Sequence, residues 1–282
     1  MGGKYKLLPT IIPMFPDKIN TFVDLFGGGF NVGINVNAKH IIYNDICKQV
    51  VDLLEHFYQY DSEYIHNKII ETITKFELSR SDINGYETYG CESSKGLGEY
   101  NKPKYFELRK SYNLDPDWIK FYTLITYSFS NQIRFNSKGE FNMPYGKRDY
   151  NISLQDKLKK FVDELHKKDC TFLNIPFEQF DISDLTEWDF VYADPPYFNS
   201  VATYNENGGW TEESENNLLS LLDKLDSKDV SFALSNNLKY ENPILDKWKD
   251  KYNVHYLNHD YSNCNYQKKD KSKDIEVLIT NY

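Results

Sequence analysis

Residues 190–197 read Phe-Val-Tyr-Ala-Asp-Pro-Pro-Tyr. The apolar first half predicts a strand buried inside a sheet, and the strand ends abruptly because two consecutive prolines cannot continue a central strand. The turn that follows is rigid and holds a carboxylate and an aromatic ring at the edge of the sheet. Asp194, Pro195, Pro196 and Tyr197 are therefore the candidate catalytic residues.

Such a turn suits the chemistry of an amino group that is conjugated with an aromatic ring, such as N6 of adenine. That nitrogen is a poor nucleophile because its lone pair is delocalised into the ring. Asp194 together with the backbone carbonyl of Pro195 can accept both amino hydrogens and so favour a pyramidal, nucleophilic nitrogen. The ring of Tyr197 can stack on a base that has left the duplex.

Six further short runs of apolar, β-branched or aromatic residues predict strands of the same sheet: Thr21–Phe26, His40–Tyr43, Thr171–Leu173, Val230–Leu234, Val254–Leu257 and Ile275–Thr280. Helical patterns lie between them, at Gln49–Tyr58 and Glu215–Leu225. Strands that alternate with helices predict a three-layer α/β fold with a mostly parallel sheet.

A glycine-rich turn, Phe26-Gly-Gly-Gly-Phe-Asn31, follows the first predicted strand. Glycines at the carboxyl end of a strand allow the backbone to turn tightly and to approach a ligand closely. The turn lacks the Gly-Lys-Ser/Thr ending of a P-loop, which disfavours nucleotide triphosphate hydrolysis. Asp45, at the end of the next strand, is placed either to accept hydrogen bonds from a ribose or to cap the helix that follows.

Residues 62–165 break the alternation of strands and helices and predict an inserted domain, so that residues 1–61 and 166–282 form a discontinuous catalytic domain. The net charge of −9 argues mildly against nucleic acid as a partner. Residues 95–169, however, contain 15 Lys/Arg and 10 Asp/Glu, a local charge of +5. A basic insert between acidic flanks is typical of a DNA-binding lobe, although a solvated lysine-rich surface has the same composition.

The Asp-Pro-Pro-Tyr turn with an upstream glycine turn resembles the amino-methyltransferases of DNA. The order of glycine turn, insert and catalytic turn is similar to that of the Dam-type (alpha-class) DNA adenine-N6 methyltransferases. The Gly2-Gly3-Lys4-Tyr5 segment resembles the start of that family, and Phe172-Leu-Asn-Ile-Pro-Phe177 resembles the segment that frames the cofactor's adenine. The resemblance implies a Rossmann-like S-adenosylmethionine-dependent fold with a mixed seven-stranded sheet and an inserted target-recognition domain.

The cofactor implied by this resemblance is S-adenosylmethionine, with S-adenosylhomocysteine as the product and no metal. The scattered cysteines fit this expectation, because no Cys-x-x-Cys pair or nearby histidine has metal-ligand spacing. The candidate cofactor-binding residues are Lys4, Tyr5, Asp24, Phe26, Gly27, Gly28, Gly29, Asn31, Asp45, Ile46, Pro176, Phe177 and Asp194.

Residues 131–146 of the insert, Asn-Gln-Ile-Arg-Phe-Asn-Ser-Lys-Gly-Glu-Phe-Asn-Met-Pro-Tyr-Gly, resemble the target-recognition hairpin of that family. Arginine can bind guanine bidentately, amide side chains suit base edges, cations suit phosphates, and an exposed aromatic ring can fill the place of a flipped base. The candidate DNA-binding residues are Phe129, Asn131, Gln132, Arg134, Asn136, Lys138, Asn142, Lys147 and Arg148.

The implied substrate is an adenine of double-stranded DNA, flipped out of GATC or a related site. We expect the insert and a lysine-rich loop at Lys268–Lys273 to clamp the duplex. Residues 69–101 suggest no role. Two alternatives remain open: methylation of N4 of cytosine, which is chemically parallel, and a catalytically silent DNA-binding subunit of the same fold.

No run approaches the roughly 20 apolar residues that a membrane-spanning helix needs, and no signal segment opens the chain. We therefore expect a cytoplasmic protein with no membrane partner. A cognate restriction endonuclease is an expected partner, and the expected oligomeric state is a monomer or a weak dimer.

Overall fold

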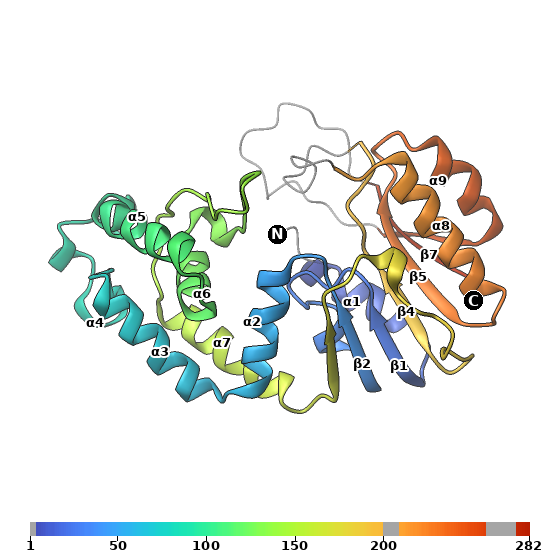
Figure 1. Ribbon diagram of the computed structural model, residues 1–282, viewed down its shortest axis with the longest axis horizontal. Coiled ribbons are helices and arrows are strands. Elements are labelled where there is room, and N and C mark those ends of the chain that lie inside the picture. The colour runs from blue at the N-terminus through green and yellow to red at the C-terminus, as the bar shows by residue number, and fades with distance from the viewer. Residues whose placement is uncertain (1–3, 200–208, 258–274) are drawn as a thin grey trace. The chain divides into compact units, whose positions relative to one another are not determined.

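A computed structural model describes residues 4–199, 209–257 and 275–282. The chain forms two compact units, one made of Gln49–Lys167 and the other of Gly2–Lys48 with Lys168–Tyr282. We call them the helical unit and the sheet unit, and Figure 1 shows the helical unit mostly in green. The helical unit begins at Gln49, before the residue 62 at which the sequence pattern changes.

The sheet unit is built on seven strands in the order β3-β2-β1-β4-β5-β7-β6. Neighbours from β3 to β5 run parallel, whereas β7 is antiparallel to both β5 and β6. The predicted mixed, mostly parallel sheet is therefore confirmed. Its strands are β1 (Ile19–Asp24), β2 (Ala38–Asn44), β3 (Cys170–Leu173), β4 (Phe190–Ala193), β5 (Ser231–Asn237), β6 (Asn253–Leu257) and β7 (Glu276–Thr280).

Strand β1 is shorter than the sequence pattern predicts, because it ends at Asp24 and not at Phe26. Beyond Asp24, single backbone hydrogen bonds still join Leu25 to β4 and Gly27 to β2, and the Asp24 carboxylate accepts a hydrogen bond from the amide of Gly33 at 3.0 Å. In β1 and β4, Asp24 pairs with Tyr192, so the two strands end side by side. This register places the glycine turn and the Asp194 turn next to each other at the carboxyl edge of the sheet.

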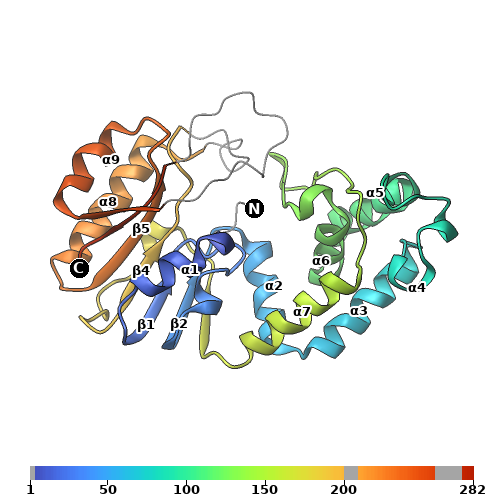
Figure 2. The same cartoon turned by 180° about the vertical axis from the view of Figure 1, so that it is seen from behind.

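Helices cover one face of the sheet and the N-terminal segment packs on the other (Figures 1 and 2). Leu218 and Leu222 of α8 are fully buried against sheet residues such as Phe232, and each contributes roughly 1.5–3 kcal/mol of burial free energy. On the opposite face, Phe15 packs on Phe22 and Phe190. The helices of this unit are α1 (Leu8–Ile11), α8 (Glu212–Asp226) and α9 (Pro243–Trp248), with short turns η1 (Lys4–Lys6), η2 (Ile12–Met14), η3 (Gly33–Asn35), η6 (Phe177–Gln179) and η8 (Lys249–Lys251).

The described residues of the helical unit form helices and no strand. The sequence pattern predicts only an insert without regular alternation of strands and helices, so these helices are a finding of the structure. In α3, Ile65, Ile69 and Ile73 recur at intervals of four and are buried on one face. The Asp61 carboxylate caps the helix by accepting the amide hydrogen of Tyr64 at 2.8 Å. The helices are α2 (Lys48–Gln59), α3 (Ser62–Lys75), α4 (Ser81–Asn84), α5 (Gly98–Leu114), α6 (Trp118–Tyr127) and α7 (Ile152–Leu165), with η4 (Glu87–Tyr89) and η5 (Phe129–Asn131).

Within the described ranges, no helix is both long enough and apolar enough to cross a membrane.

Candidate active site

The Asp194 turn leaves the middle of the sheet, because β4 lies between β1 and β5. All four residues of β4 are buried, and the chain then emerges at Asp194, whose side chain keeps 22% of its surface exposed. Pro195 is buried, while Pro196 and Tyr197 are half-buried. A rigid carboxylate therefore lies at the boundary between the core and the edge of the sheet.

Lys4 joins this turn from the opposite end of the chain. Its ammonium group lies 3.3 Å from Oδ1 of Asp194 and 3.0 Å from Oε2 of Glu276, and it also donates to the hydroxyl of Tyr197. The side chain of Lys4 is only 7% exposed. Three of the predicted residues, Lys4, Asp194 and Tyr197, are thus brought into one hydrogen-bonded cluster.

Burial and the neighbouring charges shift the pKa values of Lys4 and Asp194 in opposite directions. Burial alone would lower the pKa of Lys4, but the nearby Asp194, Tyr192 and Glu276 raise it, and the net shift is upward. Burial raises the pKa of Asp194, and the neighbouring Lys4 opposes that shift. Lys4 therefore stays charged, and it helps to keep the Asp194 carboxyl ionised.

Glu276 is not singled out by the sequence pattern, although it completes this cluster. It is the first residue of β7 and is followed in sequence by apolar strand residues. An acidic residue in a fully buried strand signals a specific partner, because an unpaired buried charge is costly. That signal does not identify the partner, and Lys4 lies 272 residues away along the chain.

The glycine turn is shaped by the ring of Tyr43, which is fully buried. A Cβ atom on Gly27 would lie 2.1 Å from this ring, so only glycine fits there. Gly28 has a φ of +49°, in the left-handed region that favours glycine. The Tyr43 hydroxyl donates to the carbonyl of Gly28 at 2.8 Å and fixes the turn.

Asp45 closes the same turn. Its Oδ2 accepts the amide hydrogen of Gly28 and its Oδ1 accepts that of Cys47, both at 2.8 Å. Burial raises the pKa of Asp45, while the hydrogen bonds from Cys47 and Gly28 oppose that shift. The carboxylate thus braces the glycine turn and the residues just before α2; the ribose contact stays a prediction.

Asp24 lies deeper, with 1% exposure. Burial raises its pKa to about 7; the hydrogen bond from Gly33 opposes this shift, whereas the nearby Asp194 and Asp45 add to it. Its low exposure and its hydrogen bond from Gly33 place the Asp24 carboxyl behind the glycine turn.

Three aromatic rings gather beside the glycine turn. The rings of Phe26 and Phe177 lie 5.2 Å apart, and Trp210 lies 5.6 and 5.5 Å from them. The sequence pattern does not single out Trp210, whose indole N–H donates to the buried carboxylate of Glu215. Two other predicted cofactor-binding residues lie on the surface: Tyr5 is 72% exposed and Ile46 is 70% exposed.

The remaining cofactor candidates belong to the loops around these rings. Gly29 and Asn31 lie in the glycine turn, and Pro176 precedes the short η6 turn that carries Phe177. Gly2 and Gly3 lie outside the described residues, as does the Lys268–Lys273 loop.

The predicted recognition hairpin is a loop closed by two isolated bridges, Ser128 with Tyr145 and Phe135 with Phe141, and not by two paired strands. Its turn is held by Asn136, whose Oδ1 accepts the amide hydrogens of Lys138 and Glu140. Side-chain hydrogen bonds therefore add to the backbone hydrogen bonds that cross this loop.

Several candidate base-reading side chains are hydrogen-bonded inside this loop. Asn142 accepts the Nε–H of Arg134 at 2.8 Å through Oδ1, and its carbonyl accepts Nη2–H at 3.1 Å. Asn131 donates to the carbonyls of Ile125 and Thr126 at the end of α6. Thus these hydrogen bonds fix the orientation of Arg134, whereas the Asn131 amide ties the loop to the end of α6.

The other candidates in the loop are more accessible. Phe129 is 53% exposed, Gln132 is half-buried, and the cations Lys138, Lys147 and Arg148 are exposed. Arg148 also donates to the hydroxyl of Tyr86 at 3.2 Å.

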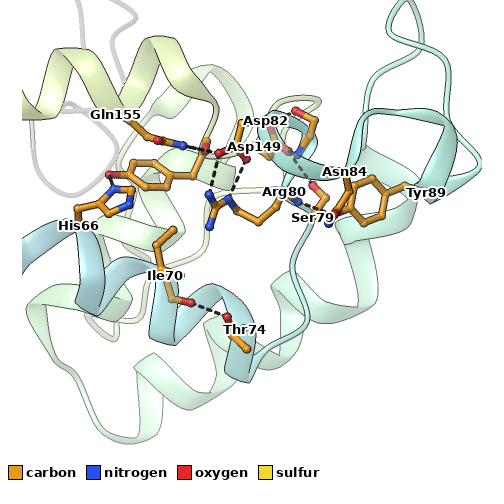
Figure 3. A network of polar contacts seen from close by, with 12 residues as sticks. His66, Ile70, Thr74, Ser79, Arg80, Asp82, Asn84, Tyr89, Asp149 and Gln155 are labelled. Carbon is orange, nitrogen blue, oxygen red and sulfur yellow. Dashed lines mark hydrogen bonds and ion pairs between the residues drawn. The ribbon is translucent and has the colours of Figure 1, made fainter.

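A buried polar network braces the helical unit (Figure 3). The Asp149 carboxylate, fully buried, accepts hydrogen bonds from the hydroxyls of Ser79 and Ser81 and from the amide of Ser81. Arg80 forms a bidentate pair with Asp82 at 2.7 and 2.8 Å. Part of the segment 69–101, for which the sequence suggests no role, thus anchors the residues that follow the recognition loop.

Comparisons with known proteins agree with this arrangement. The family model described as D12 class N6 adenine-specific DNA methyltransferase matches residues 1–263. Over 291 residues the chain is 42% identical to the type II methyltransferase M.FokI of Planomicrobium okeanokoites, covering 100% of this chain and 42% of that protein. It is 37% identical over 293 residues to the modification methylase StsI of Streptococcus sanguinis, again with 100% and 42% coverage.

A DNA adenine methylase of Haemophilus influenzae is 27% identical over 203 residues, which cover 70% of this chain and 61% of that protein. The chain thus spans about two-fifths of the length of M.FokI and StsI. The resemblance drawn from the Asp-Pro-Pro-Tyr and glycine turns is confirmed by the family match. The chain belongs to the D12 class of N6 adenine-specific DNA methyltransferases.

Proposed function

We propose that this chain transfers a methyl group from S-adenosylmethionine to N6 of an adenine in double-stranded DNA. The observation that carries the proposal is the partly exposed Asp194 carboxylate, held in a rigid turn beside a buried cation. An acceptor fixed in this way suits an amine that must be desolvated and oriented before it reacts.

The residues around the glycine turn fit an adenosine-bearing cofactor. The turn is held in place at the sheet edge, since Gly27 packs directly on the buried ring of Tyr43. The rings of Phe26, Phe177 and Trp210 offer an apolar surface for a purine, and Asp45 lies beside the turn. When bound, S-adenosylmethionine supplies an electrophilic methyl group on a positively charged sulfur.

Charge supports the same assignment. Asp194 and Glu276 face a single cation, Lys4, so the cluster has one excess negative charge when all three groups are ionised. A negative site favours a cationic sulfonium and also stabilises positive charge that develops on an attacking amine. Asp194 would accept one amino hydrogen of the adenine, and the carbonyl of Pro195 would accept the other.

The helical unit is the proposed DNA-recognition part. Its loop would use Arg134 to read a guanine, the exposed Lys138, Lys147 and Arg148 to bind phosphates, and Phe129 to fill the place of the flipped adenine. Asn142 supports this proposal, because it orients the guanidinium of Arg134 before any DNA is bound. A GATC-related target and a partner restriction endonuclease belong to the same proposal.

Nucleoside mass spectrometry tests the proposal and its alternatives together. DNA incubated with the full chain and S-adenosylmethionine is digested to nucleosides, and N6-methyldeoxyadenosine is the expected product. N4-methyldeoxycytidine in its place would establish the cytosine alternative. An absence of any methylated nucleoside, with DNA binding retained, would establish a silent DNA-binding subunit.

A further inference from the structure

Glu276 is a buried carboxylate whose two oxygens both accept hydrogen bonds. Its Oε1 accepts Nδ2–H of Asn237, its partner residue in β5, at 3.0 Å. Its Oε2 accepts from Lys4 at 3.0 Å and from the Tyr197 hydroxyl at 3.2 Å. These contacts link three chain segments that are far apart in sequence, and they fix the carboxylate behind the catalytic turn.

Glu276 and Asp194 compete for the same two donors. Lys4 lies 3.0 Å from Glu276 but 3.3 Å from Asp194, and the Tyr197 hydroxyl lies 3.2 Å from Glu276 but 3.4 Å from Asp194. Both donors are therefore nearer to Glu276. In the described part of the chain, Oδ1 of Asp194 receives these two longer contacts, and no residue donates to its Oδ2.

We propose that Glu276 is a positioning residue that holds Lys4 and the Tyr197 hydroxyl, so that the Asp194 carboxylate is left to accept the amino hydrogens of the target base. The inference rests on the proposed amine-methylating function. It adds a residue that acts through Lys4 and Tyr197 and touches neither base nor cofactor. Without the Glu276 charge, Lys4 would pair with Asp194 alone and occupy the acceptor that the amine needs.

Five groups determine the charge environment of Asp194: Lys4, Glu276, Tyr197, Tyr192 and Asp24. Burial raises the pKa of Asp194, Lys4 lowers it and Glu276 raises it. Removing the charge of Glu276 therefore lowers the pKa of Asp194. The same change slows the reaction, since Lys4 then competes with the amine.

The test compares the wild-type chain with Glu276→Gln, which keeps the size and hydrogen-bonding capacity of the side chain. Asp189→Asn is the matched control, because Asp189 is a buried acid at the opposite end of β4 that accepts amide hydrogens from Thr21 and Thr186. Urea unfolding and circular dichroism verify that both variants are folded. If Glu276→Gln does not fold, Asn237→Ala takes its place in the test. This second variant removes the amide donor that fixes Glu276 but keeps the Glu276 charge. The expected result is then a slower reaction with no downward shift of the Asp194 pKa.

Two readouts separate positioning from a merely structural role. In single-turnover methylation, Glu276→Gln should be slower by about 10- to 100-fold, with the acid limb of its pH profile moved to lower pH. Carbon-13 NMR of the side-chain carboxyls, without cofactor and assigned with Asp194→Asn, should show the same downward shift of the Asp194 pKa. Asp189→Asn should change neither readout.

For Glu276→Gln, a rate within twofold of wild type, or a slower rate with an unmoved acid limb and an unchanged Asp194 pKa, would overturn the inference alone. For Asn237→Ala, a rate within twofold of wild type would overturn it. A wild-type chain that methylates no base would instead overturn the proposed function, and the NMR titration would still decide whether Glu276 controls Asp194.

Discussion

Replacing Gly27 with alanine places a methyl group where the ring of Tyr43 already lies. The new Cβ would be 2.1 and 2.3 Å from two ring carbons, far inside van der Waals contact. The ring is fully buried and packs on Phe30 and Phe172 at centroid distances of 5.1 and 5.8 Å. Either the ring or the turn must therefore move.

The cost follows from what that movement breaks. Overpacking a close-packed core costs roughly 1–3 kcal/mol, and losing the hydrogen bond from Tyr43 to the Gly28 carbonyl costs about 1 kcal/mol more. We therefore expect Gly27→Ala to lower the free energy of unfolding by about 2–4 kcal/mol. Because the displaced turn lines the proposed cofactor site, affinity for S-adenosylmethionine should fall at least about tenfold, equivalent to 1.4 kcal/mol.

Urea unfolding and titration calorimetry with S-adenosylmethionine measure the two effects. Gly29→Ala is the matched control in the same turn, since its Cβ would meet only the end of the flexible Asn31 side chain, at 3.2 Å. The control should stay within about 0.5 kcal/mol of wild type. The reasoning is refuted if Gly27→Ala is as stable as Gly29→Ala and binds the cofactor with wild-type affinity.

Three further substitutions probe other parts of the chain. Lys4→Met removes the cation that opposes the burial-driven rise of the Asp194 pKa, so the acid limb of a methylation pH profile should move to higher pH; an unmoved or lowered limb would contradict this. Asp149→Ala leaves the donors of Ser79, which is buried, and of Ser81, which is half-buried, without their acceptor and should cost about 2–4 kcal/mol in urea unfolding. A loss under about 1 kcal/mol would show that the network adds little. Arg134→Ala should weaken binding to the cognate site by about 1–3 kcal/mol in a fluorescence titration and leave non-cognate binding unchanged; equal weakening of both would assign Arg134 to phosphate contact.

The sequence predicts the parts of this fold whose signals are local. Short apolar runs predict all seven strands. The Asp194 turn is predictable because proline restricts the backbone, and the glycine turn because glycine allows conformations that other residues avoid. The boundaries are less certain where tertiary contacts decide them. Strand β1 ends two residues before Phe26, where the chain bends into the glycine turn.

What the sequence does not predict depends on long-range contacts. Glu276 and Lys4 form an ion pair across 272 residues, and no local pattern links them. Trp210, which lies just before α8, contacts Phe26 and Phe177, which follow β1 and β3, so the three rings come from segments far apart in sequence. In α3 the four-residue spacing of three isoleucines is a local helical signal, but it stands in a segment that is otherwise mostly polar.

The most direct test is single-turnover transfer of a tritiated methyl group to duplex DNA by the purified chain and by Asp194→Ala. The wild-type chain should label adenine, while Asp194→Ala should bind S-adenosylmethionine, retain its fold and transfer no methyl group. Transfer by Asp194→Ala at the wild-type rate would contradict the assignment of this carboxylate to the target amine.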